Sequence, residues 1–275
     1  MTLTIVIPCR DDPRVVECVR SVDADAEILI VLNGSPPDFA DMVRREVGAR
    51  ARIEILPLPN RSSAVEQGIR TASFDRVLLM DSDCVFEAGS IAAVERAFDG
   101  GASDEEVYKG RIVFDPGPAR SSALVARSRS QRMGHVTTAY KPPLAVSRRL
   151  RNRLGGYFFD SRLPWKEDAD LDYRVRQAGI RIVPVEGCVI HHAPLAVGAD
   201  LTSSFRYGVG AAIARHLDVP LPQPRRSVVE SLRRHGAEAA LYMVVNNLVR
   251  TAGYSYARAR LHLSRGRWLA QVVGA

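Results

Sequence analysis

Short apolar runs alternate with helical patterns through the first eighty residues, and this alternation limits the folds that the chain can adopt. Most runs are rich in Val, Ile and Leu without intervening polar residues. Such runs are typical of strands buried on both faces of a parallel sheet and joined by helical crossovers. The sequence therefore predicts an α/β domain with a mostly parallel central sheet flanked by helices. Strands are expected at residues 3–7, 27–32, 52–56 and 76–80, and helices at 11–22, 37–47 and 62–72.

The rest of the chain is less regular. Strands are expected at residues 107–114 and 180–185, and a helix at 167–177. Residues 120–132 carry four arginines and fit either a helix or a mobile loop. From Leu201 onward the pattern is helical. We expect a main domain over residues 1–217, with halves 1–114 and 115–217, then a Pro-rich break at 219–226 and a C-terminal amphipathic helical extension over 225–275.

The extension carries an apolar stripe with helical spacing, formed by Leu241, Val244, Val245 and Leu248, with arginines on either side. The longest apolar run there, residues 239–245, is far shorter than the ~20 residues that span a bilayer. The stripe is compatible with docking on an anionic membrane surface, packing on the main domain, or a homodimer. No basic and apolar leader precedes the first strand, so we expect a cytoplasmic protein, either free or peripheral to the inner face of the membrane.

The formal net charge is +7, and arginine carries almost all of the positive charge because the chain has only three lysines. Arginine favours bidentate contacts with phosphate and carboxylate. The charge is therefore compatible with an anionic substrate, a nucleic acid or an anionic membrane, and also with a GC-rich genome alone. Aromatic residues are not interleaved with the arginine clusters, so no nucleic acid partner is expected. The four cysteines form no C-x-x-C pair, which argues against a zinc or redox framework.

Asp81 and Asp83 close the strand expected at residues 76–80. The D-x-D pattern occurs three more times in the chain, so position rather than pattern distinguishes this pair. Residues i and i+2 of an extended segment share a face, so the two carboxylates can converge on a hard cation such as Mg²⁺ or Mn²⁺. The alternative is a solvated acidic turn or a helix cap.

Two further clusters could carry chemistry. Glu167 and Asp168 begin a predicted helix, where acids favour the helix dipole but could also supply a general base. Trp165 just before them could stack on a sugar or be a core residue. His191 and His192 follow an apolar run, and because adjacent strand residues face opposite ways, only one could complete a metal site; a structural role is the alternative.

In this order, the segments resemble the family 2 glycosyltransferases, which have the GT-A fold. The resemblance covers roughly residues 2–215, and no single motif in it is specific, whereas the ordered set is. The segments that carry it are "LTIVIPCRDD", "EILIVLNGSPPD", "NRSSAVEQGI", "RVLLMDSDCVF", "LGGYFFDSRLPWKEDADLDYRVRQAG" and "VIHH".

The resemblance implies transfer of one sugar from a nucleoside-diphosphate sugar to an acceptor hydroxyl, with Mg²⁺ or Mn²⁺ as cofactor and inversion by direct displacement. Asp168 is implied as the catalytic base and Glu167 as its neighbour. The implied metal ligands are Asp81, Asp83 and either His191 or His192; the nucleotide-sugar residues are Pro8, Cys9, Arg10, Asp11, Asn33, Arg61, Asp81 and Ser82; and the acceptor residues are Gly156 and Trp165.

Three positions depart from the family pattern. Leu32 stands where an aspartate often contacts the base, so a UDP-sugar is the first expectation while other nucleobases stay open. Glu66 stands where Asn is frequent, and Ser264 replaces the Gln of the processive members' Q-x-x-R-W. A nucleotidyltransferase is the alternative enzyme, although "PCRDD" lacks the glycines of its phosphate loop. A basic membrane-surface or nucleic-acid module without catalysis is the third alternative.

Overall fold

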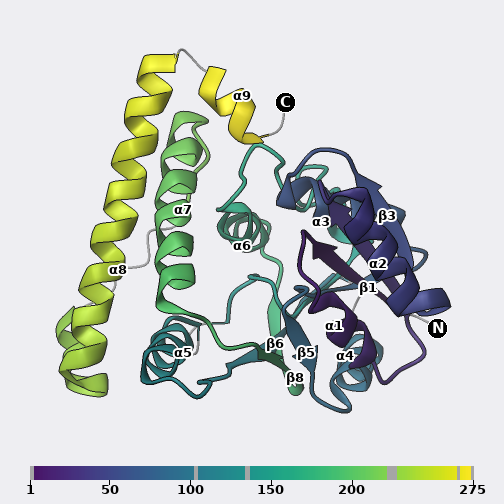
Figure 1. Ribbon diagram of the computed structural model, residues 1–275. Coiled ribbons are helices and arrows are strands. Elements are labelled where there is room, and N and C mark those ends of the chain that lie inside the picture. The colour runs from purple at the N-terminus through teal and green to yellow at the C-terminus, as the bar shows by residue number, and fades with distance from the viewer. Residues whose placement is uncertain (1–2, 102–104, 134–136, 222–227, 265–266, 274–275) are drawn as a thin grey trace.

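The computed structural model describes residues 3–101, 105–133, 137–221, 228–264 and 267–273 (Figure 1). Its centre is an eight-stranded sheet in the order β3-β2-β1-β4-β7-β6-β8-β5. The strands are β1 (Leu3–Cys9), β2 (Glu27–Asn33), β3 (Arg52–Leu56), β4 (Arg76–Leu79), β5 (Cys84–Phe86), β6 (Val107–Phe114), β7 (Leu144–Ser147) and β8 (Ile182–His192). The helices are α1 (Val15–Arg20), α2 (Pro37–Val47), α3 (Arg61–Thr71), α4 (Ser90–Gly100), α5 (Arg120–Met133), α6 (Glu167–Gln177), α7 (Val197–His216), α8 (Val228–Ser264) and α9 (Arg267–Val273), with short 3-10 turns at Gly48–Arg50 and Arg148–Arg151.

The sheet is parallel in its first half and mixed in its second. β3, β2, β1 and β4 run parallel, as the sequence predicts. β7 is antiparallel to both β4 and β6, whereas β8 is parallel to β6. The chain winds outward from β1 to β3 and then crosses to β4 on the other side of β1. The carboxyl ends of β1 and β4 therefore meet at a switch point, where ligands bind in open α/β sheets.

Both faces of the sheet are covered, which explains the unbroken apolar runs. Along β1, Leu3, Ile5 and Ile7 pack with α1, α2 and α4, whereas Val6 faces the opposite side with α3 and α6. Gly68 lets α3 approach β1, because a Cβ at this position would lie 2.3 Å from Cγ1 of Val6.

Several elements differ from the sequence prediction. The helix expected at residues 11–22 spans only Val15–Arg20, because Asp11 has a left-handed φ of 52° and the residues after it form a turn. The strand expected at residues 180–185 is the start of β8, which continues to His192. β5 was not expected, since three residues are too few to show a period. Residues 120–132 are helical, within α5.

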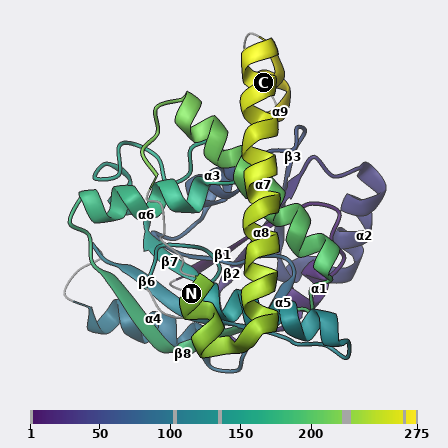
Figure 2. The ribbon, with the colours of Figure 1, turned by 90° about the vertical axis from the view of Figure 1, so that its left-hand side faces the viewer.

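The C-terminal helices pack onto the main domain rather than standing apart. α7 and α8 lie side by side along one flank of the molecule (Figures 1 and 2). Their backbones approach closely, because a Cβ at Gly208 would lie 1.9 Å from the carbonyl oxygen of Arg250. α9 folds back, and the carbonyl of Val273 accepts a 2.7 Å hydrogen bond from the side chain of Asn60. Most of the Pro-rich break, residues 222–227, lies outside the described residues. Within the described part of the chain, no helix is long and apolar enough to cross a membrane.

Candidate active site

The site is built where β4 ends and the short β5 begins. The buried strand β4 leads into the turn that carries Asp81 and Asp83. β5 then pairs antiparallel with β8, in a register that sets Cys84 opposite His192. This register, which joins residues more than a hundred positions apart, brings the imidazole to the D-x-D turn.

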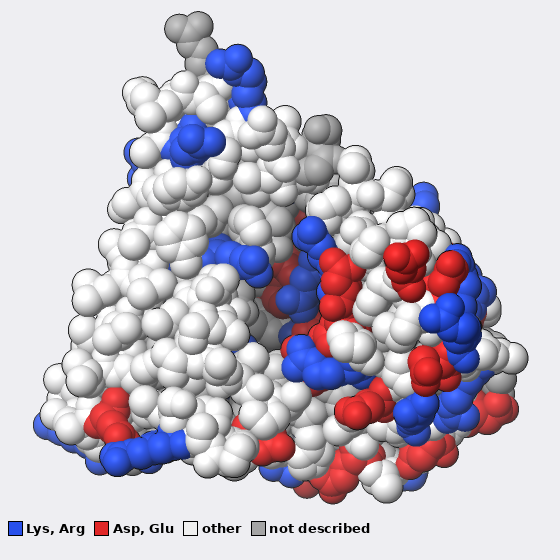
Figure 3. Space-filling view, in the orientation of Figure 1, with Lys and Arg blue, Asp and Glu red and all other residues white. Residues whose placement is uncertain are grey.

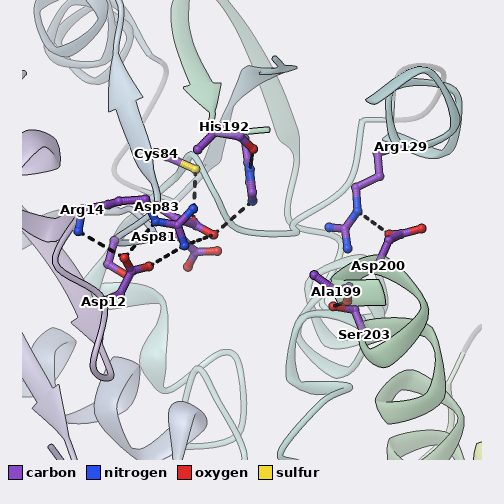
Figure 4. A network of polar contacts seen from close by, with 12 residues as sticks. Asp12, Arg14, Asp81, Asp83, Cys84, Arg129, His192, Ala199, Asp200 and Ser203 are labelled. Atoms are coloured by element: carbon purple, nitrogen blue, oxygen red, sulfur yellow. Dashed lines mark hydrogen bonds and ion pairs between the residues drawn. The ribbon is translucent and has the colours of Figure 1, made fainter. Parts of the chain in front are cut away.

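Asp83 and His192 form the core of a candidate metal site (Figure 4). Oδ2 of Asp83 lies 3.2 Å from Nε2 of His192. Nδ1 of His192 lies 2.7 Å from the carbonyl of Ala193, which can only accept, so Nδ1 carries a proton and Nε2 faces the carboxylate. Burial would raise the pKa of Asp83, but the hydrogen bond and charge of His192, together with the charge of Arg14, hold it below its usual range.

Cys84 completes a group of three ligand atoms that lie within 4.8 Å of one another. Its thiol is buried, and burial, followed by the charges of Asp83 and Asp81, raises its pKa far above the usual value. The sulfur therefore stays protonated, and a hard cation prefers oxygen ligands. Cys84 is best described as a packing residue beside the ligands.

The structure separates two other predicted ligands from this group. Among the described residues, neither Asp81 nor His191 belongs to it. His191 faces the other way, with Nε2 3.1 Å from a carboxylate oxygen of Glu87. Asp81 instead accepts a 2.6 Å hydrogen bond from Arg61. Burial would raise the pKa of Asp81, but the charges of Arg61 and Lys141 hold it below the usual value.

Lys141 joins the D-x-D turn to the start of α6. Its side chain is fully buried, with Nζ 3.5 Å from Glu167, 4.0 Å from Asp168 and 4.0 Å from Asp81. Asp168 is the more open of the two acids beside Lys141 on α6, with 23% of its side chain exposed against 5% for Glu167. Burial raises the pKa of Asp168 to about 6; Glu167 also raises it, while the charges of Lys141 and Arg61 oppose the shift. Asp168 therefore has the pKa of a general base that works near neutral pH.

Sequence reasoning missed Lys141. The loop that carries Lys141 is bonded to Lys109, whose Nζ donates to the carbonyl oxygens of Tyr140, Pro142 and Pro143. Burial lowers the pKa of Lys109 to about 8. A signal was present, because lysine is rare in this arginine-rich chain and two of its three lysines lie under this site.

The predicted nucleotide residues lie around the carboxyl ends of β1 and β2. Asn33 is nearly buried, and its Oδ1 accepts a 2.6 Å hydrogen bond from the backbone of Asn60. Ser82 donates a 3.4 Å hydrogen bond to Asp12, which also pairs with Arg14. Arg14 lies 3.7 Å from Asp83. Asp12 and Arg14 were not predicted, although both lie in the "PCRDDPR" segment. Of the predicted set, Pro8 and Cys9 are buried at the end of β1, whereas Arg10 and Asp11 are exposed.

The two predicted acceptor residues lie in different surroundings. Gly156 is exposed in a turn with φ +91°, and Trp165 is partly buried against the cluster formed by α7 and α8. Glu66, which sequence reasoning could not explain, accepts hydrogen bonds of 3.0 and 3.1 Å from the backbone of Phe158 and Phe159. It therefore fixes the segment that leads to α6.

Charged groups line the hollow between the two halves of the molecule. Figure 3 shows acidic and basic residues at its floor, whereas the surface over α7 and α8 is mostly uncharged. Arg129 on α5 lies over the ring of Phe114, which in turn packs on His192. Nε of Arg129 donates a 2.6 Å hydrogen bond to Asp200 on α7 (Figure 4). Asp200 is fully buried and also accepts a 2.9 Å hydrogen bond from the hydroxyl of Tyr242.

Comparison with known sequences decides the family. The family described as "Glycosyl transferase family 2" matches residues 4–143, which contain the D-x-D turn and Lys141. The chain belongs to glycosyl transferase family 2. The chain also resembles uncharacterized glycosyltransferases of Mycobacterium bovis and Mycobacterium tuberculosis, with 31% identity over 101 residues, or 36% of this chain and 45% of each relative. The match thus spans less than half the length of these curated relatives.

Solved structures share the fold of this chain. Mannosyltransferase PcManGT from Pyrobaculum calidifontis, in complex with GDP-Man and Mn²⁺, matches with TM-score 0.58 and 17% identity over 99% of this chain and 78% of that one. Glucosyl-3-phosphoglycerate synthase from Mycobacterium tuberculosis, in complex with Mn²⁺, UDP and phosphoglyceric acid, matches with TM-score 0.55 and 19% identity over 81% and 80%. The predicted α/β GT-A fold with C-terminal helices is confirmed.

Proposed function

We propose that this glycosyltransferase moves one sugar from a nucleoside-diphosphate sugar to an acceptor hydroxyl by direct, inverting displacement. The carrying observation is that the buried Nζ of Lys141 lies 4.0 Å from Asp81, in the turn that also carries Asp83, and 4.0 Å from Asp168. A leaving-group site and a base are thereby held at opposite ends of one small network. The family and the cation- and nucleotide-bound structures that share its fold support this interpretation over a nucleotidyltransferase or a non-catalytic basic module.

The donor set of Asp83 and His192 fits Mn²⁺ or Mg²⁺. A carboxylate oxygen and an imidazole nitrogen face each other across 3.2 Å, and hard divalent cations accept carboxylate and keep positions for phosphate oxygens. The histidine favours Mn²⁺ over Mg²⁺, which prefers oxygen throughout. When bound, the cation would neutralise charge on the departing diphosphate. Arg14 and Arg61 would supply further positive charge beside that leaving group.

Asp168 would accept the proton of the acceptor hydroxyl as its oxygen forms a bond to the anomeric carbon. At the same time the bond from that carbon to the diphosphate oxygen breaks, and the nucleoside diphosphate leaves with the electron pair. Lys141 would hold Asp168 and Glu167 in place through its buried Nζ. Because one displacement inverts the anomeric carbon, no enzyme nucleophile is needed.

The donor nucleotide would lie over the ends of β1 and β2, beside Arg10, Asp11 and Arg61. Leu32 is fully buried there and offers no hydrogen bond to a base. We therefore propose a UDP-sugar as the first donor to test and a GDP-sugar as the second. Trp165 and Gly156 would contact the acceptor.

Two substitutions separate binding from chemistry. Asp83→Ala should abolish the metal-dependent part of donor binding, whereas Asp168→Asn should bind the donor normally and lose about a hundredfold or more in transfer rate. Asp41→Asn, an exposed carboxylate of α2, is the matched control and should change neither quantity. Near-normal transfer by Asp168→Asn, measured as nucleoside diphosphate release with a panel of acceptors, would contradict the assignment of the base.

A further inference from the structure

The apolar stripe of α8 faces away from the protein. Leu241, Leu248 and Leu263 are 66%, 65% and 77% exposed. Tyr256 borders this face: it is 46% exposed, and its ring packs 5.7 Å from that of Phe205 and 6.0 Å from that of Trp268. At 100° per residue, these four side chains fall within about 80° of one another around the helix and extend along about 33 Å of it. Figure 2 shows α8 as the outermost element on its side of the molecule. The sequence shows a stripe here but not which way it points.

The opposite side of α8 accounts for its packing on the protein. Gly253 and Ala257 face α7, and a Cβ at Gly253 would lie 2.1 Å from the carbonyl oxygen of Phe205. Tyr242 and Asn246 are buried and bond to residues of α7. The helix therefore already has a complete inner face, and the leucines of its outer face contribute nothing to the described core.

The charges around the stripe are mainly basic, and the one acid beside it, Glu238, one turn before Leu241, is already paired with Arg120 and Arg127 of α5. Residues 239–275 contain five arginines and no aspartate or glutamate. Arg258 and Arg260 are exposed and lie about 100° to either side of Leu241 around the helix, at the edges of the apolar face. Arginines at such edges can extend to lipid phosphates while their methylene groups cover apolar surface.

We propose that the outer face of α8 docks on an anionic membrane surface, with Leu241, Leu248 and Leu263 at the acyl boundary. The helix would lie in the plane of the interface, as apolar faces flanked by basic residues do. A second copy of the chain fits less well. A two-fold contact through this stripe would bring the arginines of both copies together, and residues 239–275 offer no acid to pair with them. This docking goes beyond the transfer reaction and does not depend on it.

Flotation of the full chain with lipid vesicles tests the proposal. We expect the protein to float with vesicles of phosphatidylcholine and phosphatidylglycerol but not with phosphatidylcholine alone, and to dissociate in part as salt screens the arginines. The double variant Leu248→Glu/Leu263→Glu should bind at least about tenfold more weakly. Arg258→Gln and Arg260→Gln should each weaken binding about fivefold.

Matched controls exclude general effects of the substitutions. Leu58→Glu replaces a leucine that is 56% exposed outside α8, and Arg44→Gln removes an exposed arginine of α2; both should bind vesicles like the parent chain. Because Leu248 and Leu263 are exposed, the double variant should keep the parent melting temperature. Equal flotation of parent and double variant, or no flotation with anionic vesicles, would overturn the proposal. A third result would also overturn it: light scattering shows that the parent chain is a dimer and the double variant a monomer, while the parent chain does not float with vesicles.

Discussion

At the scale of single residues, the environment divides three neighbouring carboxylates into two kinds. The pKa values of Asp81 and Asp83 are held down by cations that outweigh the effect of burial, whereas the pKa of Asp168 is raised. Such opposed shifts separate charge-binding groups from a proton acceptor. The first two could be singled out from the sequence because they follow a buried strand. Lys141 offers only the rarity of lysine in this chain as a signal, since its contacts with the acids form only once its loop folds over α6.

The pKa of Asp168 predicts an acid limb in the pH dependence of transfer. Asp168 must be deprotonated to accept a proton, and its pKa is about 6. The rate should therefore be constant at pH 7.5 to 8 and fall about tenfold per pH unit well below pH 6. The measurement is kcat/KM against pH at saturating Mn²⁺. A profile that is flat down to pH 4.5 would show that another group takes the proton.

Removing the buried cation should destabilise the fold in a pH-dependent way. Lys141→Met leaves Asp81, Glu167 and Asp168 without their shared counter-charge, so we expect a loss of about 3 kcal/mol in unfolding free energy at pH 8. The loss should shrink near pH 5, because Asp168 is then mostly protonated. Urea titrations at both pH values measure this difference. Lys166→Met, at the half-exposed lysine before α6, is the control and should cost much less.

At the scale of elements, the spacing of apolar residues predicts the long buried strands and the regular helices but not the short or irregular elements. β1 to β4, α2, α3 and α6 lie where the sequence predicts them, because each has a full apolar run or face. β5 is too short, and α1 is shortened by the turn at Asp11. For α8 the sequence pattern predicts an apolar stripe. However, the opposite face of the helix packs on α7, because Gly208 and Gly253 let the two backbones approach. Small residues leave no hydrophobic signal, so packing through them is not visible in a periodicity.

The contact between α7 and α8 should depend on its glycines. Gly208→Ala places a Cβ 1.9 Å from the carbonyl oxygen of Arg250, so the helices must separate. We expect a loss of about 2 to 3 kcal/mol in unfolding free energy. Gly198→Ala in the same helix meets nothing within 4 Å and should be neutral or slightly stabilising. Thermal melts of both variants test this; equal melting temperatures would mean that the helices do not pack this closely.

At the scale of the whole molecule, a few long-range bonds tie the site to the C-terminal helices. Asn60 caps α3 by accepting from Ser63, and its side chain donates to the carbonyl oxygens of Ser161 and Val273. Asp200 joins α5 to α8 through Arg129 and Tyr242. The order of the segments predicts the family and its fold, but these ties connect residues up to 213 positions apart and have no local signature.

Asn60 should therefore be important for the stability of the whole chain. Asn60→Ala removes a helix cap and leaves two carbonyls without their donor, so we expect a loss of about 2 to 3 kcal/mol in unfolding free energy. Asn152→Ala, at an exposed turn residue, is the matched control and should change it little. Urea unfolding measures both. If Asn60→Ala lowers the unfolding free energy by less than the loss of an ordinary helix cap would, the hydrogen bond from Asn60 to α9 does not stabilise the chain.

The central claim is that the register between β5 and β8 places His192, and not His191, beside Asp83 as the second ligand of the cation. Calorimetric titration of UDP and GDP into the protein, with and without Mn²⁺, tests it most directly in the two adjacent variants His192→Ala and His191→Ala. We predict that His192→Ala weakens the Mn²⁺-dependent binding by about tenfold or more, whereas His191→Ala binds like the parent chain. Loss of that binding in His191→Ala, with His192→Ala unaffected, would contradict the account.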